Sequence, residues 1–95
     1  MGTYPLTVST PDGRAFSGEA EGLFLRAAYG DIAILAGHIP LMTTVKPCIC
    51  RIRRPEGPEL RARVTGGLLT VGREQVILMA HSWEPEEERA ETGLR

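Results

Sequence analysis

The sequence predicts an all-β domain, a sandwich or barrel of short strands, and three observations support this prediction. Short runs alternate apolar and polar side chains with a period of two, which is the pattern of a strand that buries one face. Seven prolines and eleven glycines are spread through the chain and leave no room for a long helix before residue 82. Turn-forming residues also recur at short intervals, at residues 11–13, 18, 22, 30–31, 37, 46–47, 55–58, 66–67 and 72.

The strand pattern begins near the start of the chain. Tyr4, Leu6 and Val8 share one face of the first run, with Pro5 and Thr7 on the opposite face. The same alternation recurs between the later turns, at residues 23–27, 48–53 and 59–64. Each run predicts a short strand whose apolar face points toward a common core.

Two places depart from this one-sided pattern. Phe24 lies opposite its apolar neighbours Leu23 and Leu25, and the run at residues 76–80 is apolar on both faces. A strand of this kind is either covered by a second layer or exposes an apolar patch to a partner. Both interpretations stay open, and the second indicates an interaction module.

The end of the chain has a different character. Pro85 and the acidic residues around it are typical of the first turn of a helix, because acidic side chains complement the helix dipole there. The segment is short and has no apolar stripe, so we expect a frayed helical or disordered tail. We find no internal repeat or linker, and we expect one domain over residues 1–82 followed by an acidic tail over residues 83–95.

Composition excludes several classes of protein. The 95 residues include eleven basic and twelve acidic side chains and carry a net charge of −1, which argues against a dedicated nucleic-acid binder. No apolar run reaches the length of a membrane span, and the first residues lack the features of a signal peptide. We therefore expect a cytosolic location or attachment to the cytosolic side of a larger assembly.

The sequence predicts no catalytic residues, metal or cofactor. The two histidines, His38 and His81, accompany no serine in a nucleophile-elbow context, and Gly66 begins no phosphate-binding loop. Cys48 and Cys50 could contribute to a zinc site, but their spacing is not that of a zinc knuckle. Their place on an apolar face favours buried free thiols.

One polar face allows an alternative function. The hairpin predicted over residues 51–63 carries arginines on one side, and such a face could bind RNA or acidic ligands in a free-standing β-sandwich module. A solvated face is favoured, because the chain is slightly acidic and poor in aromatic residues. The four arginines are Arg51, Arg53, Arg61 and Arg63.

Several segments, in their order and spacing, resemble the N-terminal domain of the epsilon subunit of F-type ATP synthase. The most specific is Gly-Asp-Ile-Ala-Ile-Leu-Ala-Gly-His-Ile-Pro-Leu at residues 30–41. The others lie at residues 10–19, 45–47, 64–71 and 76–80, so the resemblance runs from about residue 4 to residue 82. It implies a flattened β-sandwich of about ten short strands, in agreement with the strand pattern.

The resemblance also implies a role without catalysis. Epsilon belongs to the central rotor stalk, where it binds the gamma subunit and rests on the polar loops of the membrane c-ring. Ring rotation driven by protons or sodium ions is thereby passed to the catalytic head. We expect a peripheral protein on the cytosolic face of a bacterial inner membrane, attached only through the complex and without nucleic-acid partners.

Two contact regions follow from the resemblance. The turn at Gly30 and Asp31 is expected to face the c-ring, where its acidic group could meet basic or amide groups. The gamma-facing region is expected to have an apolar centre with polar contacts around it. Its residues are Thr10, His38, Ile39, Leu41, Met42 and Thr43. An alternative role for His38 is to stabilise its turn by bonding to its own backbone.

The chain also departs from the family pattern. Cys48 stands where the family commonly has glycine, and Cys50 replaces an aliphatic residue. Family members usually carry a C-terminal helical hairpin, which in some bacteria binds ATP through an Ile-Asp-x-x-Arg-Ala motif. Only Arg89 and Ala90 of that motif are present here, so we expect neither ATP binding nor inhibition by a hairpin.

Overall fold

Ten β-strands account for most of residues 2–86, which are the residues that the computed structural model describes. Within this range the structure contains no helix, and the predicted all-β fold of about ten short strands is confirmed. The strands are β1 (Tyr4–Thr10), β2 (Gly13–Ala20), β3 (Gly22–Ala27), β4 (Gly30–Leu35), β5 (Leu41–Val45), β6 (Cys48–Arg53), β7 (Leu60–Val64), β8 (Gly67–Val71), β9 (Val76–Ala80) and β10 (Glu84–Pro85).

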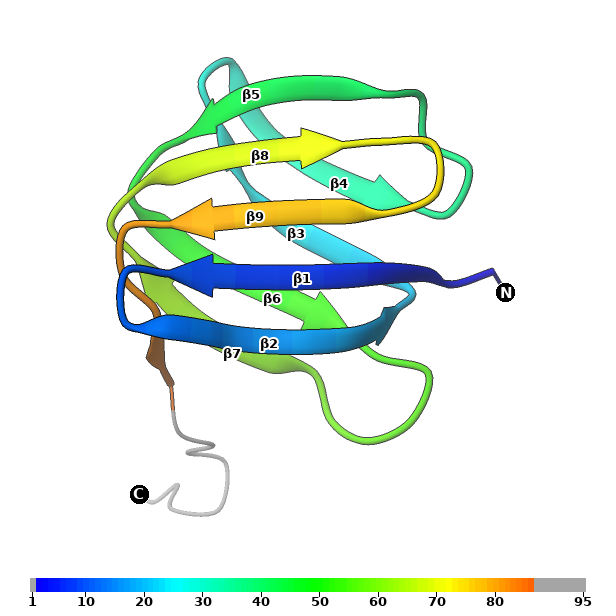
Figure 1. Cartoon of the computed structure of the whole chain (residues 1–95), viewed down its shortest axis with the longest axis horizontal. Coiled ribbons are helices and arrows are strands. Elements are labelled where there is room, and N and C mark those ends of the chain that lie inside the picture. The colour runs from blue at the N-terminus through cyan, green and yellow to red at the C-terminus, as the bar shows by residue number, and fades with distance from the viewer. Residues whose placement is uncertain (1, 87–95) are drawn as a thin grey trace.

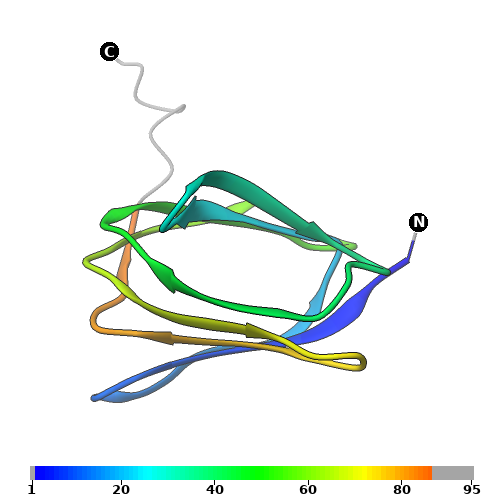
Figure 2. The same cartoon turned by 90° about the horizontal axis from the view of Figure 1, so that it is seen from above.

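The strands form one sheet that folds over on itself into two layers. Its order is β10-β7-β6-β3-β5-β8-β9-β1-β2, and β4 pairs with β3 outside this path. In Figure 1 a front layer contains β5, β8, β9, β1 and β2, and a back layer contains β4, β3, β6 and β7. Figure 2 shows the same two layers from above as a flattened sandwich. The layers meet where Ala27 of β3 pairs with Val45 of β5.

Nearly all pairs of neighbouring strands are antiparallel, and β1 with β9 is the parallel exception among the described strands. There Leu6 lies opposite Val76 and Ser9 lies opposite Met79. This pairing places one of the first strands of the chain beside one of the last. The first and the ninth strand are therefore neighbours in the same sheet.

The core forms where the inward faces of the two layers meet. The predicted inward residues Tyr4, Leu6 and Val8 are buried on the front layer, and Ile34 and Ile52 are buried on the back layer. The Tyr4 hydroxyl donates a hydrogen bond of 2.6 Å to the buried carbonyl oxygen of Ile34. This bond ties β1 to β4 across the sandwich. It is favourable because a buried carbonyl without a hydrogen-bond partner would be costly.

The two-layer fold shows which side chains are buried at the two places that depart from the alternating pattern. In β9, Val76, Leu78 and Ala80 face the core, whereas the Met79 side chain is exposed on the outer surface. The run therefore exposes apolar groups, and no second layer of the described residues covers them. Phe24 likewise points to the outer side of the back layer, where it is half-buried.

The described part of the predicted tail differs from the expected helical first turn. Glu84 and Pro85 form strand β10, which pairs with β7, and the backbone N–H of Glu86 donates to the carbonyl of Arg61 at 2.8 Å. The edge of β7 offers unpaired backbone N–H and C=O groups. Pairing with β10 provides hydrogen-bond partners for the backbone groups of both segments. Trp83 packs against the core just before β10. The rest of the predicted tail, including Arg89, lies outside the described residues.

Candidate functional site

The outer side of the front layer is uncharged from β5 to β1, whereas Arg14 and Glu19 of β2 bring charges to its edge. Strand register places nine outward side chains side by side on β5, β8, β9 and β1, and none of the nine is charged. Two of them are strongly exposed methionines, Met42 at 66% and Met79 at 48%. The nine residues are Pro5, Thr7, Ser9, Met42, Thr44, Leu68, Thr70, Ile77 and Met79. We call this surface the uncharged face.

A shallow hollow lies at one end of the uncharged face, beside Met79. It has a volume of about 470 Å³ and is lined mainly by apolar surface, with Pro11, Leu68 and Met79 among the lining residues together with Thr10 and His81. Methionine side chains are flexible and polarizable, so they adapt to irregular partner surfaces. An uncharged sheet face with an apolar hollow and two exposed methionines is suited to contact with another protein.

The predicted gamma-facing residues on β5 divide between the two sides of the strand. Met42 lies on the uncharged face, whereas Thr43 is buried and its hydroxyl donates to the carbonyl of Thr44 at 3.1 Å. Leu41 is half-buried and packs against the core. Because successive side chains of a strand point to opposite faces, the uncharged face receives Met42 but neither Leu41 nor Thr43.

His38 and Ile39 lie in the connection between β4 and β5. The Nδ1 atom of His38 is 2.7 Å from the carbonyl oxygen of Ile39, so Nδ1 carries the proton and donates it. The backbone N–H of His38 also donates to the carbonyl of Leu35 at 3.1 Å. This is the turn-stabilising arrangement that the sequence left open as an alternative. Ile39 beside it is 74% exposed.

Thr10 lies at the other end of the sandwich. Its hydroxyl donates to the carbonyl of Gly13 at 3.0 Å and accepts from the N–H of Asp12 at 3.1 Å, which closes the β1–β2 turn. Figure 1 shows this turn at the left end and the β4–β5 connection at the right end. The structure therefore does not bring Thr10 to His38, and the uncharged face lies between them.

The turn between β3 and β4 contains the residues predicted to face the c-ring. Gly30 has a φ of 132°, a backbone conformation that favours glycine. Asp31 pairs with Arg26 directly across the hairpin, with 2.8 Å between Nε and Oδ1. The hydrogen bond and charge of Arg26 lower the pKa of the Asp31 carboxyl.

Sequence reasoning missed the residue at the tip of this turn. Tyr29 is 68% exposed, and it directly precedes Gly30. The signal was present in the sequence, since a large aromatic residue beside a turn glycine is poorly placed to reach a core. Tyr29 thus adds an aromatic group to the surface that was expected to be acidic.

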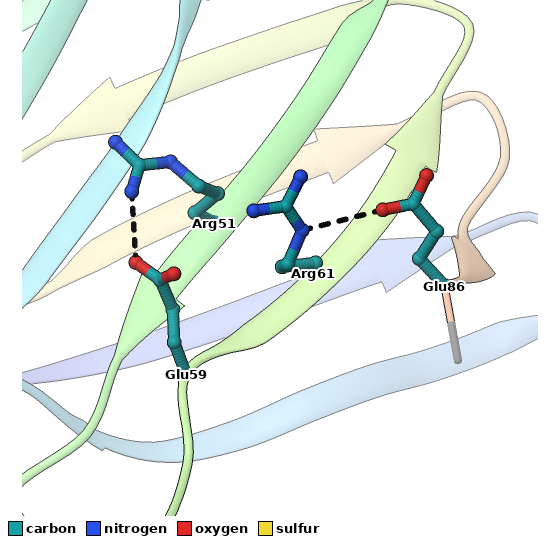
Figure 3. A network of polar contacts seen from close by, with 4 residues as sticks. All are labelled: Arg51, Glu59, Arg61 and Glu86. Atoms are coloured by element: carbon teal, nitrogen blue, oxygen red, sulfur yellow. Dashed lines mark hydrogen bonds and ion pairs between the residues drawn. The ribbon is translucent and has the colours of Figure 1, made fainter. Parts of the chain in front are cut away.

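The four arginines of the alternative function share the outer side of β6 and β7, as the register predicts. Figure 3 shows that two of them face glutamates: Arg51 Nη1 is 3.0 Å from Glu59 Oε2, and Arg61 Nε is 3.2 Å from Glu86 Oε1. These pairs lower the net positive charge of the surface. They favour a solvated face over a nucleic-acid surface.

Phe24 contributes to the same arginine side. The guanidinium carbons of Arg51 and Arg53 lie 4.6 Å and 5.0 Å from the centre of the Phe24 ring. Both are within the range of a cation–π contact. The two arginines therefore cover an aromatic ring that would otherwise be exposed to water.

Cys48 and Cys50 both point inward from β6 and are free thiols. Burial raises the pKa of Cys50 to about 12, so this thiol is protonated at neutral pH. Among residues 2–86, no three His, Cys, Asp or Glu side chains are grouped so that they could hold a metal ion. The same residues include no helix that is long and apolar enough to cross a membrane.

Comparison with solved structures supports the fold. The structure superposes with a TM-score of 0.83 and 18% identity on a chain of the Euglena gracilis mitochondrial ATP synthase, over 98% of this chain and 61% of that one. A chain from the central stalk and c-ring structure of the Tetrahymena thermophila mitochondrial ATP synthase matches with a TM-score of 0.76 and 12% identity, over 99% of this chain and 75% of that one. At these identities the likeness concerns the fold.

Comparison with sequence relatives identifies the family, and not only the fold. The ATP synthase epsilon chain of Persephonella marina is 41% identical over 76 residues, which cover 80% of this chain and 56% of the relative. That of Bacillus pumilus is 36% identical over 84 residues, which cover 88% of this chain and 63% of the relative. The chain thus spans about three fifths of the length of these relatives. The family model of the β-sandwich domain of the ATP synthase delta/epsilon chain matches residues 3–86. The chain therefore belongs to the ATP synthase delta/epsilon family, as a member of its epsilon-type β-sandwich domains.

Proposed function

We propose that this chain is a non-catalytic subunit of the central stalk of an F-type ATP synthase, where it links the gamma subunit to the c-ring. Family membership supports the proposal, together with bacterial relatives named ATP synthase epsilon chain. Two chains of the same fold come from ATP synthase structures whose descriptions name the c-ring. In this proposal the catalytic sites lie on other subunits.

The observation that carries the proposal is the difference between the two outer faces of the sandwich. The uncharged face exposes Met42 and Met79, whereas the outer side of the back layer carries arginines and their glutamate partners. A stable contact between subunits has an apolar centre from which charges are depleted. We therefore propose that gamma docks on the uncharged face, with Met42 and Met79 in the centre of the contact.

The architecture suits a part that transmits force. Backbone pairing runs through both layers, and the Tyr4–Ile34 hydrogen bond joins them through the core. A rigid body between gamma and the ring passes rotation on without dissipating it in internal deformation. We propose that the chain acts at the cytosolic face of a bacterial inner membrane, held there only by its partner subunits.

The proposal is tested by co-elution of the purified chain with the gamma subunit of the same organism. The wild-type chain is expected to form a one-to-one complex that survives a rise from about 0.1 M to about 0.5 M NaCl, because salt screens charged contacts but not apolar ones. Met42→Asp and Met79→Asp are each expected to weaken the complex about tenfold or more, since each places an unpaired charge in an apolar contact.

The matched control is Ala33→Asp, which adds the same charge at an exposed position on the outer side of the back layer. This variant is expected to bind gamma like the wild type. Separate elution of the wild-type chain and gamma at both salt concentrations contradicts the proposed function. Equal weakening by Ala33→Asp and Met42→Asp contradicts the assignment of gamma to the uncharged face.

A further inference from the structure

A second hollow lies on the outer side of the back layer, where β3 and β6 separate. It has a volume of about 560 Å³, and its mainly apolar lining comes from β3, β4 and β6. The two strands pair as far as Phe24 and Arg51. Beyond this point β3 turns toward the front layer, where Ala27 pairs with Val45 of β5. The separation of the strands opens this space, which we call the arginine hollow.

Cys48 lies in the gap between the two strands. Its Sγ atom accepts a hydrogen bond of 3.4 Å from the backbone N–H of Arg26. In a continuous ladder this N–H would donate to a carbonyl of the neighbouring strand, and a thiol is a weaker acceptor. The thiol thus gives the N–H a partner without drawing the strands together, so the hollow persists between them.

Two guanidinium groups line the arginine hollow, Arg26 from β3 and Arg51 from β6. Each donates to one carboxylate oxygen, Arg26 to Asp31 at 2.8 Å and Arg51 to Glu59 at 3.0 Å. The Arg51 guanidinium also lies 4.6 Å from the centre of the Phe24 ring. A guanidinium has five N–H donors, so each arginine keeps donors for a further acceptor. These contacts order both groups in advance, which lowers the entropic cost of binding a ligand.

The rest of the lining is suited to an apolar group. Phe24, Ala33 and Ile49 contribute side chains from three adjacent strands. A concave apolar surface beside two guanidinium groups is complementary to a small organic anion, whose charged end meets the arginines and whose apolar part lies on the sheet. The carboxylates of Asp31 and Glu59 compete with such a ligand, but ion pairs that are open to solvent are weak and can be replaced.

We propose that the arginine hollow binds a small soluble organic anion, a carboxylate or a phosphate monoester with an apolar body, and that Arg26 and Arg51 hold its charged group. The inference goes beyond the proposed function and does not depend on it. The arginine hollow lies on the back layer, whereas the uncharged face lies on the outer side of the front layer (Figures 1 and 2). A concave site of this volume favours a small molecule over the extended surface of a nucleic acid or a membrane.

The test titrates the isotope-labelled full chain with phenyl phosphate at constant ionic strength and follows the backbone amide signals by NMR. Phenyl phosphate is expected to bind with a Kd of about 1 mM or below. The largest shift changes are expected at Arg26, Ala33 and Ile49. Inorganic phosphate carries the charge without the apolar body, and benzyl alcohol carries an apolar body without the charge. Each is expected to bind at least about tenfold more weakly.

Four variants test the site. Arg51→Gln is expected to weaken binding about tenfold, because it removes a charged donor. Its matched control, Arg63→Gln, removes the same charge from the same side of the sheet but outside the lining, and is expected to stay within about threefold of the wild type. Glu59→Gln releases Arg51 from its competitor and is expected to tighten binding about threefold. Ala33→Trp fills the hollow from an exposed position and is expected to abolish binding.

Five results overturn the inference, each in a different part. Absence of shift changes in the wild type up to about 10 mM phenyl phosphate refutes the site as a whole. Equal losses in Arg51→Gln and Arg63→Gln show general attraction to a basic surface. Wild-type affinity in Ala33→Trp places the ligand outside the hollow. Inorganic phosphate that binds as tightly as phenyl phosphate contradicts the ligand class. Arg51-dependent binding to phosphatidylglycerol vesicles, without binding of phenyl phosphate, contradicts a soluble ligand.

Discussion

Gly67 begins β8 at a point where the backbone of β9 passes unusually close. A Cβ atom at this position would lie 2.3 Å from the carbonyl oxygen of Met79 and 2.9 Å from the Cα of Ala80. Both atoms belong to the backbone of a paired strand, so neither can move without displacing the ladder. The position thus requires glycine for a reason of space that depends on the neighbouring strand.

Gly67→Ala is expected to lower the free energy of unfolding by about 3 kcal/mol, since overpacking forces a backbone shift. Urea unfolding measures the effect. The control is Gly18→Ala in β2, where a Cβ would make an ordinary contact of 3.4 Å with the Phe16 ring. This variant is expected to change stability by less than about 1 kcal/mol. Similar losses in both variants contradict the steric explanation.

The buried thiol of Cys50 makes stability depend on pH in the alkaline range. Burial raises its pKa from the ordinary value of 9.0 to about 12. Below pH 9 the thiol is protonated in both states, and its contribution is fully present. Above pH 9 the unfolded chain loses this proton while the folded chain keeps it, so the free energy of unfolding falls with a slope of about 1.4 kcal/mol per pH unit until the folded pKa is reached.

Cys50→Ala is expected to remove this part of the alkaline dependence. Between about pH 8 and about pH 10.5, the loss of stability measured by urea unfolding is expected to be about 2 kcal/mol smaller in the variant than in the wild type. The comparison uses slopes, because the variant also leaves a small cavity that lowers stability at every pH. Parallel curves for the two proteins above pH 9 contradict the prediction.

At the scale of elements, the end of the described chain is where local pattern and structure differ. Pro85 and its acidic neighbours are typical of a helix start, yet Glu84 and Pro85 pair with β7. Proline has no backbone N–H to donate. It is tolerated on an edge strand, because no further strand lies on the outer side to require that hydrogen bond. The free edge of β7 decides the outcome, and it is formed by residues about twenty positions earlier in the chain.

Trp83 is expected to hold β10 in place more strongly than the Arg61–Glu86 pair does. Its ring packs against the core, whereas the ion pair is exposed and 3.2 Å long. Trp83→Ala is expected to lower the free energy of unfolding by about 2 kcal/mol through lost apolar contact. Glu86→Gln is expected to cost less than about 1 kcal/mol.

Urea unfolding followed by far-UV circular dichroism compares the two variants, because Trp83 is the only tryptophan of the chain and fluorescence is lost with it. Raising the salt concentration is expected to reduce the small effect of Glu86→Gln and to leave that of Trp83→Ala unchanged. A larger loss in Glu86→Gln than in Trp83→Ala contradicts this account of β10.

At the scale of the whole molecule, the parallel pairing of β1 with β9 joins residues about seventy positions apart. It completes a front layer whose outer side combines Met42 of β5 with Met79 of β9. The alternating pattern predicted that residues 76–80 expose apolar groups or lie under a second layer. The fold selects the first possibility, because β9 lies between β8 and β1 in the front layer and only its inner residues Val76, Leu78 and Ala80 are buried in the core.

The sequence by itself determined the all-β class, the strands with their buried faces, and the family. These properties depend on local period, on turn residues and on the order of short motifs, all of which can be read along the chain. The inward positions of Tyr4, Leu6 and Val8 followed from alternation alone.

Only the tertiary structure decided which outward side chains come together. It placed Met42 and Met79 on one face, separated Thr10 from His38, turned Thr43 into the core, and paired Arg61 with Glu86. The physical reason is that a strand's pattern specifies which face is buried but not its neighbours. Strand order and register assign those neighbours, and both depend on pairing between distant segments.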